Sequence, residues 1–138
     1  MTNPDIESQR RSRETGGRRA EYAAAAALML RGYRILGRRC RTRYGEIDLV
    51  AVRGRRIAFV EVKQRRTLVE AADALMPSQI ERIQRAAEAW LDRHRRYRDH
   101  DIGLDAILVV PWRWPVHQRD VLQDGAMDWH LRPRRTRR

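Results

Sequence analysis

The sequence predicts an α/β fold, a three-layer sandwich in which a mixed central sheet of four to five strands is flanked by helices in the order αβββαββ. Two stretches have the composition and apolar spacing of helices, and a β-hairpin rich in Ile, Val and Phe lies between them. Strand-like apolar runs follow the second helix. At 138 residues the chain has the length of one domain with a single modest core.

The first helix is expected at residues 16–31, an alanine-rich stretch. Thr15 or a preceding polar residue can cap its start, and Gly32 can end it. A short strand is expected directly afterwards, at residues 33–37. This helix and strand therefore open the αβ order.

The second helix is expected at residues 78–98, after a loop that contains Pro77. Its apolar residues recur at i, i+3, i+4 and i+7, which predicts one core-facing stripe. A strand at 104–110 ends before Pro111, and residues 116–123 are expected to form a further strand at an edge of the sheet. These elements complete the predicted order.

The folded domain is expected to span residues 14–124. Residues 1–13 are polar and basic without periodicity, which is typical of a flexible N-terminal arm. Residues 125–138 end in the basic run RPRRTRR, typical of a solvated tail that could also grip phosphate.

The charge of the chain is strongly unbalanced, with 30 Lys and Arg against 18 Asp and Glu and a net charge of +12. Nearly all the positive charge is arginine, whose guanidinium group matches phosphate geometry. This balance indicates a polyanionic partner, nucleic acid before membrane, and DNA is favoured over RNA. The alternative is a proteome that encodes most of its basic positions as arginine.

Cysteine and histidine usage argues against a zinc site. Cys40 is the one cysteine, so neither an internal disulfide nor a thiolate zinc cluster can form. The histidines match no zinc spacing and are expected at the surface: His94, His100, His117 and His130.

Targeting signals are also missing from the sequence pattern. The N-terminal stretch has no apolar core of the kind a signal peptide needs. The longest apolar run, residues 23–30, is far shorter than the roughly 20 residues that a membrane-spanning helix takes. We therefore expect a soluble, cytoplasmic protein without membrane association.

The hairpin in "GEIDLVAVRGRRIAFVEVKQRR" carries charged residues inside two strands that otherwise read as buried. If the turn falls at residues 54–55, facing residues have numbers that sum to 109. Asp48 then lies opposite Glu61, and Glu46 lies opposite Lys63. A turn of four residues gives the same register, whereas one of three would break it.

Strand alternation predicts which side chains share a face of this hairpin. One face carries Asp48, Val50, Val52, Ile57, Phe59, Glu61 and Lys63, and the other carries Ile47, Leu49, Ala51, Ala58, Val60 and Val62. Both faces are apolar near the turn, as expected for strands that are covered on both sides.

The acid pair has a direct chemical interpretation. Two carboxylates this close repel each other unless a cation lies between them, and hard oxygen ligands suit Mg²⁺ or Mn²⁺. Lys63 lies on the same face, where it can reach a water or a phosphate oxygen beside the metal. This set fits phosphodiester hydrolysis. A closed salt-bridge cluster of Asp48, Glu61, Lys63 and nearby arginines is the alternative, and spacing alone leaves both open.

"GEIDLV" followed by "FVEVKQR" closely resembles the YraN family of small, uncharacterised bacterial proteins. Through that family the sequence is similar to the restriction-endonuclease-like PD-(D/E)xK superfamily of nucleases, which includes archaeal Holliday junction resolvases. The resemblance runs from about Gly16 to Gln123 and includes "GRRAEYAAAAALMLRGYRIL", "RIQRAAEAWL" and "LDAILVV". It implies a restriction-endonuclease-like three-layer sandwich.

The resemblance implies roles for the charged residues. Asp48 would be the metal-binding acid of the second core strand, and Glu61 and Lys63 would be the E and K of the E-x-K motif. Glu21 would be the additional acid that resolvase-like members place on the first helix, so the metal ligands would be Glu21, Asp48 and Glu61. Glu21 lies on a helical stripe of small residues, although it could also point to solvent.

Further residues are implied around this set. Arg65 and Arg66 follow the catalytic strand and could contact the scissile phosphate. Gln79 stands where many relatives carry a basic residue, so a hydrogen bond to nucleic acid could replace an ionic contact. Glu46 could orient Lys63 or form a plain salt bridge, and the salt bridge is favoured.

The sequence therefore predicts a Mg²⁺- or Mn²⁺-dependent endonuclease acting on DNA, with branched or damaged DNA as candidate substrates. The alternative is a nucleic-acid-binding accessory protein of repair, recombination or replication with the same fold and little or no catalysis. A basic RNA- or ribosome-associated protein is a weaker third interpretation. A homodimer is a further option, for which Trp112, Trp114 and Trp129 could supply the interface.

Overall fold

The computed structural model describes the backbone of residues 4–75 and 77–122, and side chains from residue 17 onward. Helices and strands follow one another in the predicted order, with one additional short helix and a 3₁₀ turn. The elements are α1 (Pro4–Leu30), β1 (Arg34–Thr42), β2 (Gly45–Arg53), β3 (Arg56–Gln64), α2 (Leu68–Asp73), α3 (Pro77–Arg93), the 3₁₀ turn η1 (Arg95–Tyr97), β4 (Asp101–Val109) and β5 (Val116–Gln118).

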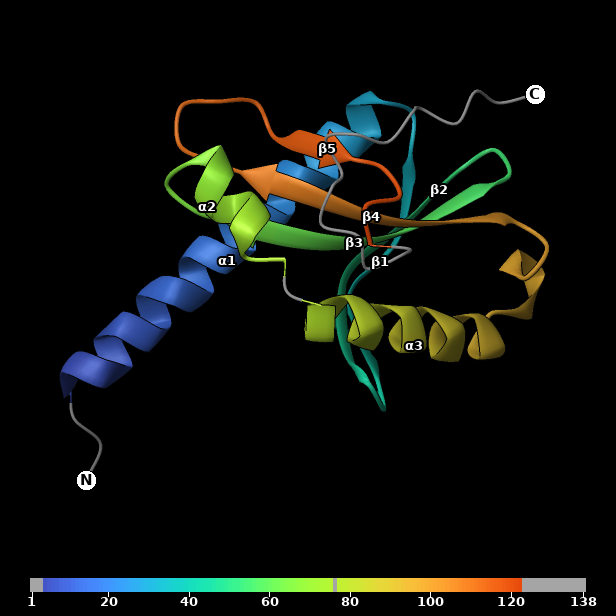
Figure 1. Ribbon diagram of the computed structural model, residues 1–138, viewed down its shortest axis with the longest axis horizontal. Coiled ribbons are helices and arrows are strands. Elements are labelled where there is room, and N and C mark those ends of the chain that lie inside the picture. Colours follow the sequence, from blue (N-terminus) through green and yellow to red (C-terminus); the bar gives the residue numbers. More distant parts are fainter. Residues whose placement is uncertain (1–3, 76, 123–138) are drawn as a thin grey trace.

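The sheet has five strands in the order β1-β2-β3-β4-β5. β3 and β4 are parallel, and the other neighbouring pairs are antiparallel, so the sheet is mixed as predicted. α1 and α3 pack against opposite sides of the sheet (Figure 1), each over its own cluster of buried apolar side chains. This is the three-layer sandwich that the sequence predicted.

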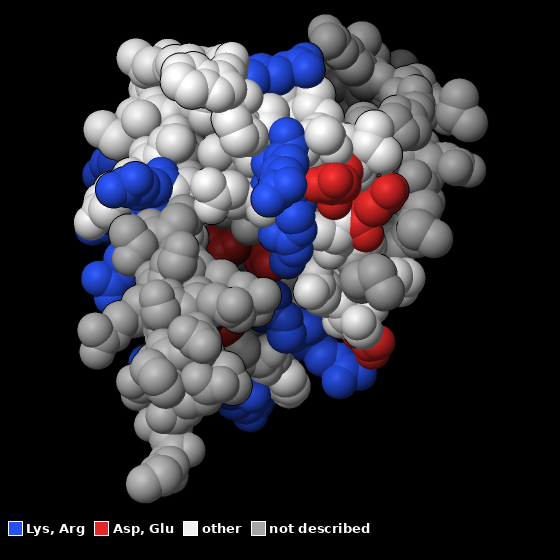
Figure 2. Space-filling view, turned by 90° about the vertical axis from the view of Figure 1, so that its left-hand side faces the viewer, with Lys and Arg blue, Asp and Glu red and all other residues white. Residues whose placement is uncertain are grey.

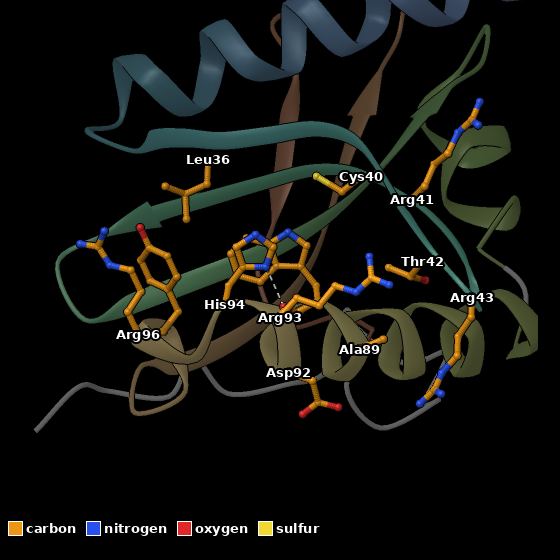
Figure 3. Close-up of a pocket in the computed structure, with 12 residues that line it drawn as sticks. Leu36, Cys40, Arg41, Thr42, Arg43, Ala89, Asp92, Arg93, His94 and Arg96 are labelled. Atoms are coloured by element: carbon orange, nitrogen blue, oxygen red, sulfur yellow. Dashed lines mark hydrogen bonds between the residues drawn. The ribbon is translucent and has the colours of Figure 1, made fainter.

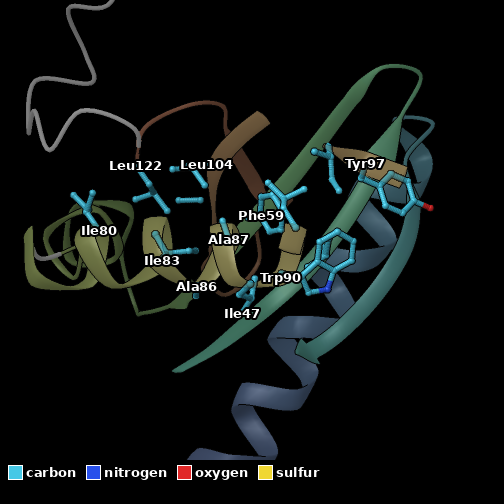
Figure 4. Packing of buried hydrophobic residues seen from close by; sticks show 14 of the residues in the cluster. Ile47, Phe59, Ile80, Ile83, Ala86, Ala87, Trp90, Tyr97, Leu104 and Leu122 are labelled. Atoms are coloured by element: carbon cyan, nitrogen blue, oxygen red, sulfur yellow. The ribbon is translucent and has the colours of Figure 1, made fainter. Parts of the chain in front are cut away.

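The larger cluster lies under α3. Its predicted stripe is buried, and Figure 4 shows Ile83, Ala87 and Trp90 pointing from α3 toward the sheet. The Trp90 ring meets the ring of Phe59 edge-on, with 5.5 Å between the centroids, a favourable aromatic geometry. The α1 side is lined by smaller residues, among them Ala24, which lets the helix approach the sheet closely.

α1 begins at Pro4, well before the predicted start at residue 16. Residues 4–13, predicted as a flexible arm, therefore belong to a helix, and Thr15 lies inside it rather than at its cap. The end at Gly32 is confirmed: its φ of +89° suits glycine, and its N–H donates to the carbonyl of Met29 at 3.0 Å.

Other boundaries also differ. β1 continues to Thr42, and α3 ends at Arg93 instead of continuing to residue 98. The 3₁₀ turn follows, and α2, capped by the Thr67 hydroxyl, occupies part of what was expected to be a loop. The tail 125–138 and Trp129 lie outside the described residues.

A buried ionic network joins the first residue of β3 to the middle of β4 and of β5. Arg56 donates two hydrogen bonds of 2.7 Å to the Asp105 carboxylate, which is fully buried. The Nε2 atom of His117 lies 2.8 Å from the same carboxylate, and Tyr33 Oη accepts a further bond from Arg56. Gly103 makes room for the Arg56 side chain, since a Cβ at this position would lie 2.2 Å from the Arg56 guanidinium. The prediction that His117 is a surface residue is wrong, since only 2% of its side chain is exposed.

Candidate functional site

The β2–β3 hairpin supplies the acid pair. A two-residue turn that includes Gly54, with a φ of +57°, joins the strands. Backbone pairing then runs in the predicted register from Arg53 with Arg56 to Leu49 with Val60. This confirms the predicted register as far as Leu49 and Val60, and the predicted pairs Asp48–Glu61 and Glu46–Lys63 are not among the paired residues.

The pairing changes character at Asp48. Its Oδ2 atom accepts a hydrogen bond of 2.8 Å from the backbone N–H of Val62, so a side chain takes the place of a ladder carbonyl. Beyond this point the predicted alternation of faces is wrong: Ile47 packs in the α3-side cluster with Val50, not on the opposite face with Leu49. The side-chain bond interrupts the regular ladder, so the period-2 rule that fixed the prediction no longer holds there.

Asp48 lies in a charged neighbourhood although it is largely buried. Burial, and next the negative charge of Glu61, raise the pKa of Asp48 from 3.8 to about 7. Glu21 contributes in the same direction, whereas the Val62 hydrogen bond and the charge of Lys63 oppose the change. The four residues that the sequence selected thus interact electrostatically in the folded chain.

Glu61 is buried, with only 8% of its surface exposed, and its two carboxylate oxygens have different partners. Lys63 Nζ lies 3.2 Å from one oxygen, and Arg82 Nη2 lies 3.5 Å from the other. Arg82 also donates to the backbone carbonyl of Glu46 at 2.9 Å, which anchors α3 to the start of β2. The E-x-K pair is therefore an ion pair.

Glu21 points from α1 toward β1 and is mostly buried, with 15% of its side chain exposed. Arg39 Nε donates to its carboxylate at 2.8 Å, and this bond raises the pKa of the Arg39 guanidinium. Of the two orientations that the sequence left open, the structure shows the one toward the protein. Its direct contact is Arg39 on β1.

Among the described residues, no group of three or more His, Cys, Asp or Glu side chains converges closely enough to hold a metal ion by itself. The Asp48–Glu61 pair still has the donor chemistry that Mg²⁺ requires, because Mg²⁺ is usually held by one or two carboxylates while water and substrate phosphate complete its coordination. Because burial and the charge of Glu61 raise the pKa of Asp48, a bound cation would favour the ionised form of Asp48. Asp48 and Glu61 therefore fit such an ion, and Glu21 is the weaker part of the predicted ligand set.

The remaining predicted residues surround this cluster. Glu46 forms an exposed salt bridge of 3.4 Å with Arg41, in line with the favoured interpretation. Arg65 and Arg66 are exposed at the end of β3. The Oε1 atom of Gln79 is buried, and within the described residues it has no hydrogen-bond partner.

Figure 2 shows the face of the molecule that bears α2 and the N-terminal part of α1. Some acidic side chains lie recessed there beside a row of Lys and Arg side chains, and other acidic side chains are exposed beyond that row. Recessed acids beside positive side chains can admit a cation and a phosphate backbone together. The exposed residues Trp112 and Trp114 belong to the segment between β4 and β5.

Sequence reasoning missed the two arginines that hold the acids. Arg39 and Arg82 were treated only as part of the general positive charge, because their contacts join elements that are distant in sequence. The signal that could have indicated Arg82 is Gly45. A Cβ at Gly45 would lie 2.8 Å from Arg82 Nη1. The glycine therefore indicated that another side chain packs against the hairpin at this position.

A sequence model described as "Uncharacterised protein family UPF0102" matches residues 20–109, which contain every predicted site residue. The chain therefore belongs to this family, the YraN family of the predicted resemblance. No helix in the described part of the chain is long and apolar enough to cross a membrane.

Curated relatives agree with this assignment. The chain is 55% identical to "UPF0102 protein mlr4633" of Mesorhizobium japonicum over 101 residues, which cover 73% of this chain and 81% of the relative. It is 51% identical to a UPF0102 protein of Methylorubrum populi over 114 residues, or 83% and 91% of the two chains. It is also 48% identical to a UPF0102 protein of Maricaulis maris over 110 residues, covering 80% and 87%.

Proposed function

We propose that this protein is a metal-dependent endonuclease that hydrolyses phosphodiester bonds in DNA, with branched or damaged DNA as its first candidate substrates. The observation that carries the proposal is the Asp48–Glu61 pair, two acids kept together at a cost that is visible in the raised pKa of Asp48. Natural proteins retain such destabilising pairs mainly at functional sites.

Asp48 and Glu61 would hold a Mg²⁺ or Mn²⁺ ion. When bound, that ion would supply Lewis-acid chemistry and lower the pKa of a coordinated water. The Val62 N–H fixes one Asp48 oxygen and so orients the carboxylate, and the other oxygen would be its ligand atom.

Lys63 would act on the phosphate. It is tied to Glu61 at 3.2 Å, so its ammonium group is held beside the acid pair, where a compact positive charge stabilises the charge that develops on a phosphoryl group. Arg65 and Arg66 extend the positive charge beyond the end of β3 and would position the nucleic-acid backbone. The chain's net charge of +12 supports a polyanionic substrate in the same way.

One observation favours a second candidate, a DNA-binding accessory protein without cleavage. Both oxygens of Glu61 are engaged by cationic side chains, Lys63 and Arg82, and Glu21 is engaged by Arg39. Such a network can be stable without a metal. The two proposals share the nucleic-acid partner and differ in whether the acids ever bind a cation.

A cleavage assay separates them. Purified protein is incubated in Mg²⁺ or Mn²⁺ with four-way, flapped, linear and single-stranded DNA, and strand scission is quantified at a single turnover. We expect metal-dependent cleavage that falls at least about 100-fold in Asp48→Asn and Lys63→Met, since each removes a charge that the reaction needs. DNA binding in EDTA should persist in both variants.

Glu81→Gln is the matched control, because it neutralises an exposed carboxylate of α3 that pairs with Arg85 in the next turn. Its cleavage rate should equal that of the wild type. Cleavage at the wild-type rate by Asp48→Asn would contradict the assigned site. Binding without scission on every substrate and with either metal would establish the accessory protein instead.

A further inference from the structure

A second cavity lies on the α3 side of the sheet, away from the acid pair. It has a volume of about 710 Å³ and opens between β1 and the C-terminal part of α3 (Figure 3). Ligand pockets commonly enclose about 300–1,000 Å³, so the cavity is large enough for one nucleotide. Leu36, Cys40 and Trp90 give it an apolar side.

The cavity presents a flat aromatic surface. The His94 ring stacks on the Trp90 ring with 3.8 Å between centroids and an angle of 10° between the planes. Its Nδ1 atom lies 2.8 Å from the backbone carbonyl of Trp90, so Nδ1 carries the proton and the ring is held in place. Trp90 is buried whereas His94 is exposed, which leaves the outer face of the imidazole available for a base to stack on.

The rim of the cavity is positive. Four arginines line it, against a single acid, Asp92. Figure 3 shows Asp92 pointing away from β1, and its carboxylate is bonded by Arg98. Arg93 extends from α3 toward β1, and within the described residues neither it nor Arg43 belongs to an ion pair.

The phosphate and the base of a bound nucleotide should occupy opposite sides of this cavity. The C-terminal end of α3 carries a partial negative charge, which disfavours an anion close to the helix end. Arg41 and Arg43 lie instead on β1 and on the turn that follows it. The Arg41–Glu46 pair is exposed and 3.4 Å long, so it competes little with a phosphate. A phosphate is therefore best placed on the β1 side, with the base on His94.

We propose that this cavity binds one unpaired nucleotide of a DNA strand, with the base on the His94–Trp90 stack and the phosphate on Arg41 and Arg43. The choice of a strand over a free nucleotide rests on the proposed function. Arg82, which contacts Glu61, and Arg93 both belong to α3, and at about 1.5 Å per residue they lie about 16 Å apart along the helix. That is about the rise of five stacked nucleotides at roughly 3.4 Å each, so one strand could reach both places.

The test is a binding measurement in EDTA, where cleavage plays no part. Fluorescence anisotropy compares a labelled duplex that carries a five-nucleotide unpaired flap with a fully paired duplex of the same length and salt. His94→Ala should weaken binding of the flapped DNA about 5- to 100-fold and change duplex binding less than about twofold, because one base-stacking contact is lost. His94→Phe should restore flap binding, since it keeps a ring and carries no charge.

Arg43→Ala tests the phosphate side against Arg113→Ala, which removes an exposed arginine outside the cavity. Only Arg43→Ala should weaken the flapped DNA more than the duplex. Equal binding by His94→Ala and wild type, or an equal loss in His94→Phe, would overturn the proposal. Wild-type binding of deoxynucleoside monophosphate as tight as that of the flap would overturn the strand assignment.

The nuclease proposal and the cavity proposal can be contradicted independently of each other. A flap preference that depends on His94 in a protein that never cuts DNA would remove the nuclease and leave the cavity assignment intact. Metal-dependent cleavage by a protein whose His94→Ala variant binds flapped DNA normally would do the reverse.

Discussion

Replacing Asp48 by Asn should make the metal-free protein more stable at pH 8, because it removes a charge that the folded state holds at a cost. In the folded chain the carboxyl has a pKa of about 7, raised from 3.8 by burial and by Glu61. Asn has nearly the same shape, and its amide oxygen can still accept the Val62 N–H.

The sign and size of this change in the free energy of unfolding follow from proton linkage. Between pH 3.8 and 7 the folded state keeps a proton that the unfolded state has released, so the free energy of unfolding falls as the pH rises and is constant above 7. A tenfold change in an equilibrium is worth about 1.4 kcal/mol, so the full penalty above pH 7 is of the order of 4 kcal/mol. Asp48→Asn should recover part of it, about 1–4 kcal/mol, because the amide is itself buried.

The assay is urea unfolding in EDTA at pH 4 and pH 8, with Glu81→Gln as the matched control. The gain of Asp48→Asn over wild type should be large at pH 8 and small at pH 4, where the Asp48 carboxyl of the folded protein is protonated and that of the unfolded chain is only partly ionised. A variant that is less stable than wild type at pH 8, or a difference independent of pH, would refute the claim that the acid pair is strained.

Three further predictions concern the rest of the fold. Asp105→Asn should destabilise by about 3–5 kcal/mol in chemical unfolding, because it removes the buried charge that pairs with Arg56 and leaves Arg56 with the more exposed Asp120; a loss below about 1 kcal/mol would contradict the network. Because Arg56 and His117 keep the pKa of Asp105 down at about 2 despite burial, wild-type stability should fall as the pH drops from about 4 to 2, and Asp105→Asn should lack that component of the fall. Gly103→Ala should also lower the melting temperature, since the new Cβ would lie 2.2 Å from the Arg56 guanidinium, and an unchanged melting temperature would show that this side chain moves freely.

The hairpin and the second helix were predictable because local rules govern them. Gly54 between two β-branched runs predicts a tight turn, and the turn fixes the register down to Leu49 and Val60. The stripe of α3 follows helical spacing and is buried as a unit. These are the parts of the fold in which local propensity and tertiary packing agree.

Other parts depend on contacts that a local pattern does not contain. The segment from Gly37 to Thr42 is arginine-rich, and it forms a strand because β2 offers it a partner. Arg56 reads as one of the basic residues of the turn, yet it crosses to Asp105, far along the chain. Gly16 and Gly17 suggest a helix boundary, whereas α1 runs through both.

For the candidate site, the sequence predicted the acids and the lysine but not their direct partners. Asp48, Glu61 and Lys63 belong to one hairpin, whose register local pattern determines as far as Leu49 and Val60. Arg39 and Arg82 belong to β1 and α3, so their contacts with Glu21 and Glu61 depend on how the layers stack. The hydrogen bond from the Val62 N–H to the Asp48 side chain forms where the regular β2–β3 pairing ends, and the hairpin pattern does not predict that end.

The central claim is that Asp48 and Glu61 are kept together in order to hold a divalent cation. The most direct measurement is anomalous diffraction from crystals soaked in Mn²⁺ at pH 8, with Asp48→Asn crystals as the matched control. The account predicts an anomalous peak between the two carboxylates in the wild type, and none in the variant. A wild-type site without manganese, in which Lys63 Nζ bridges both acids, would contradict it.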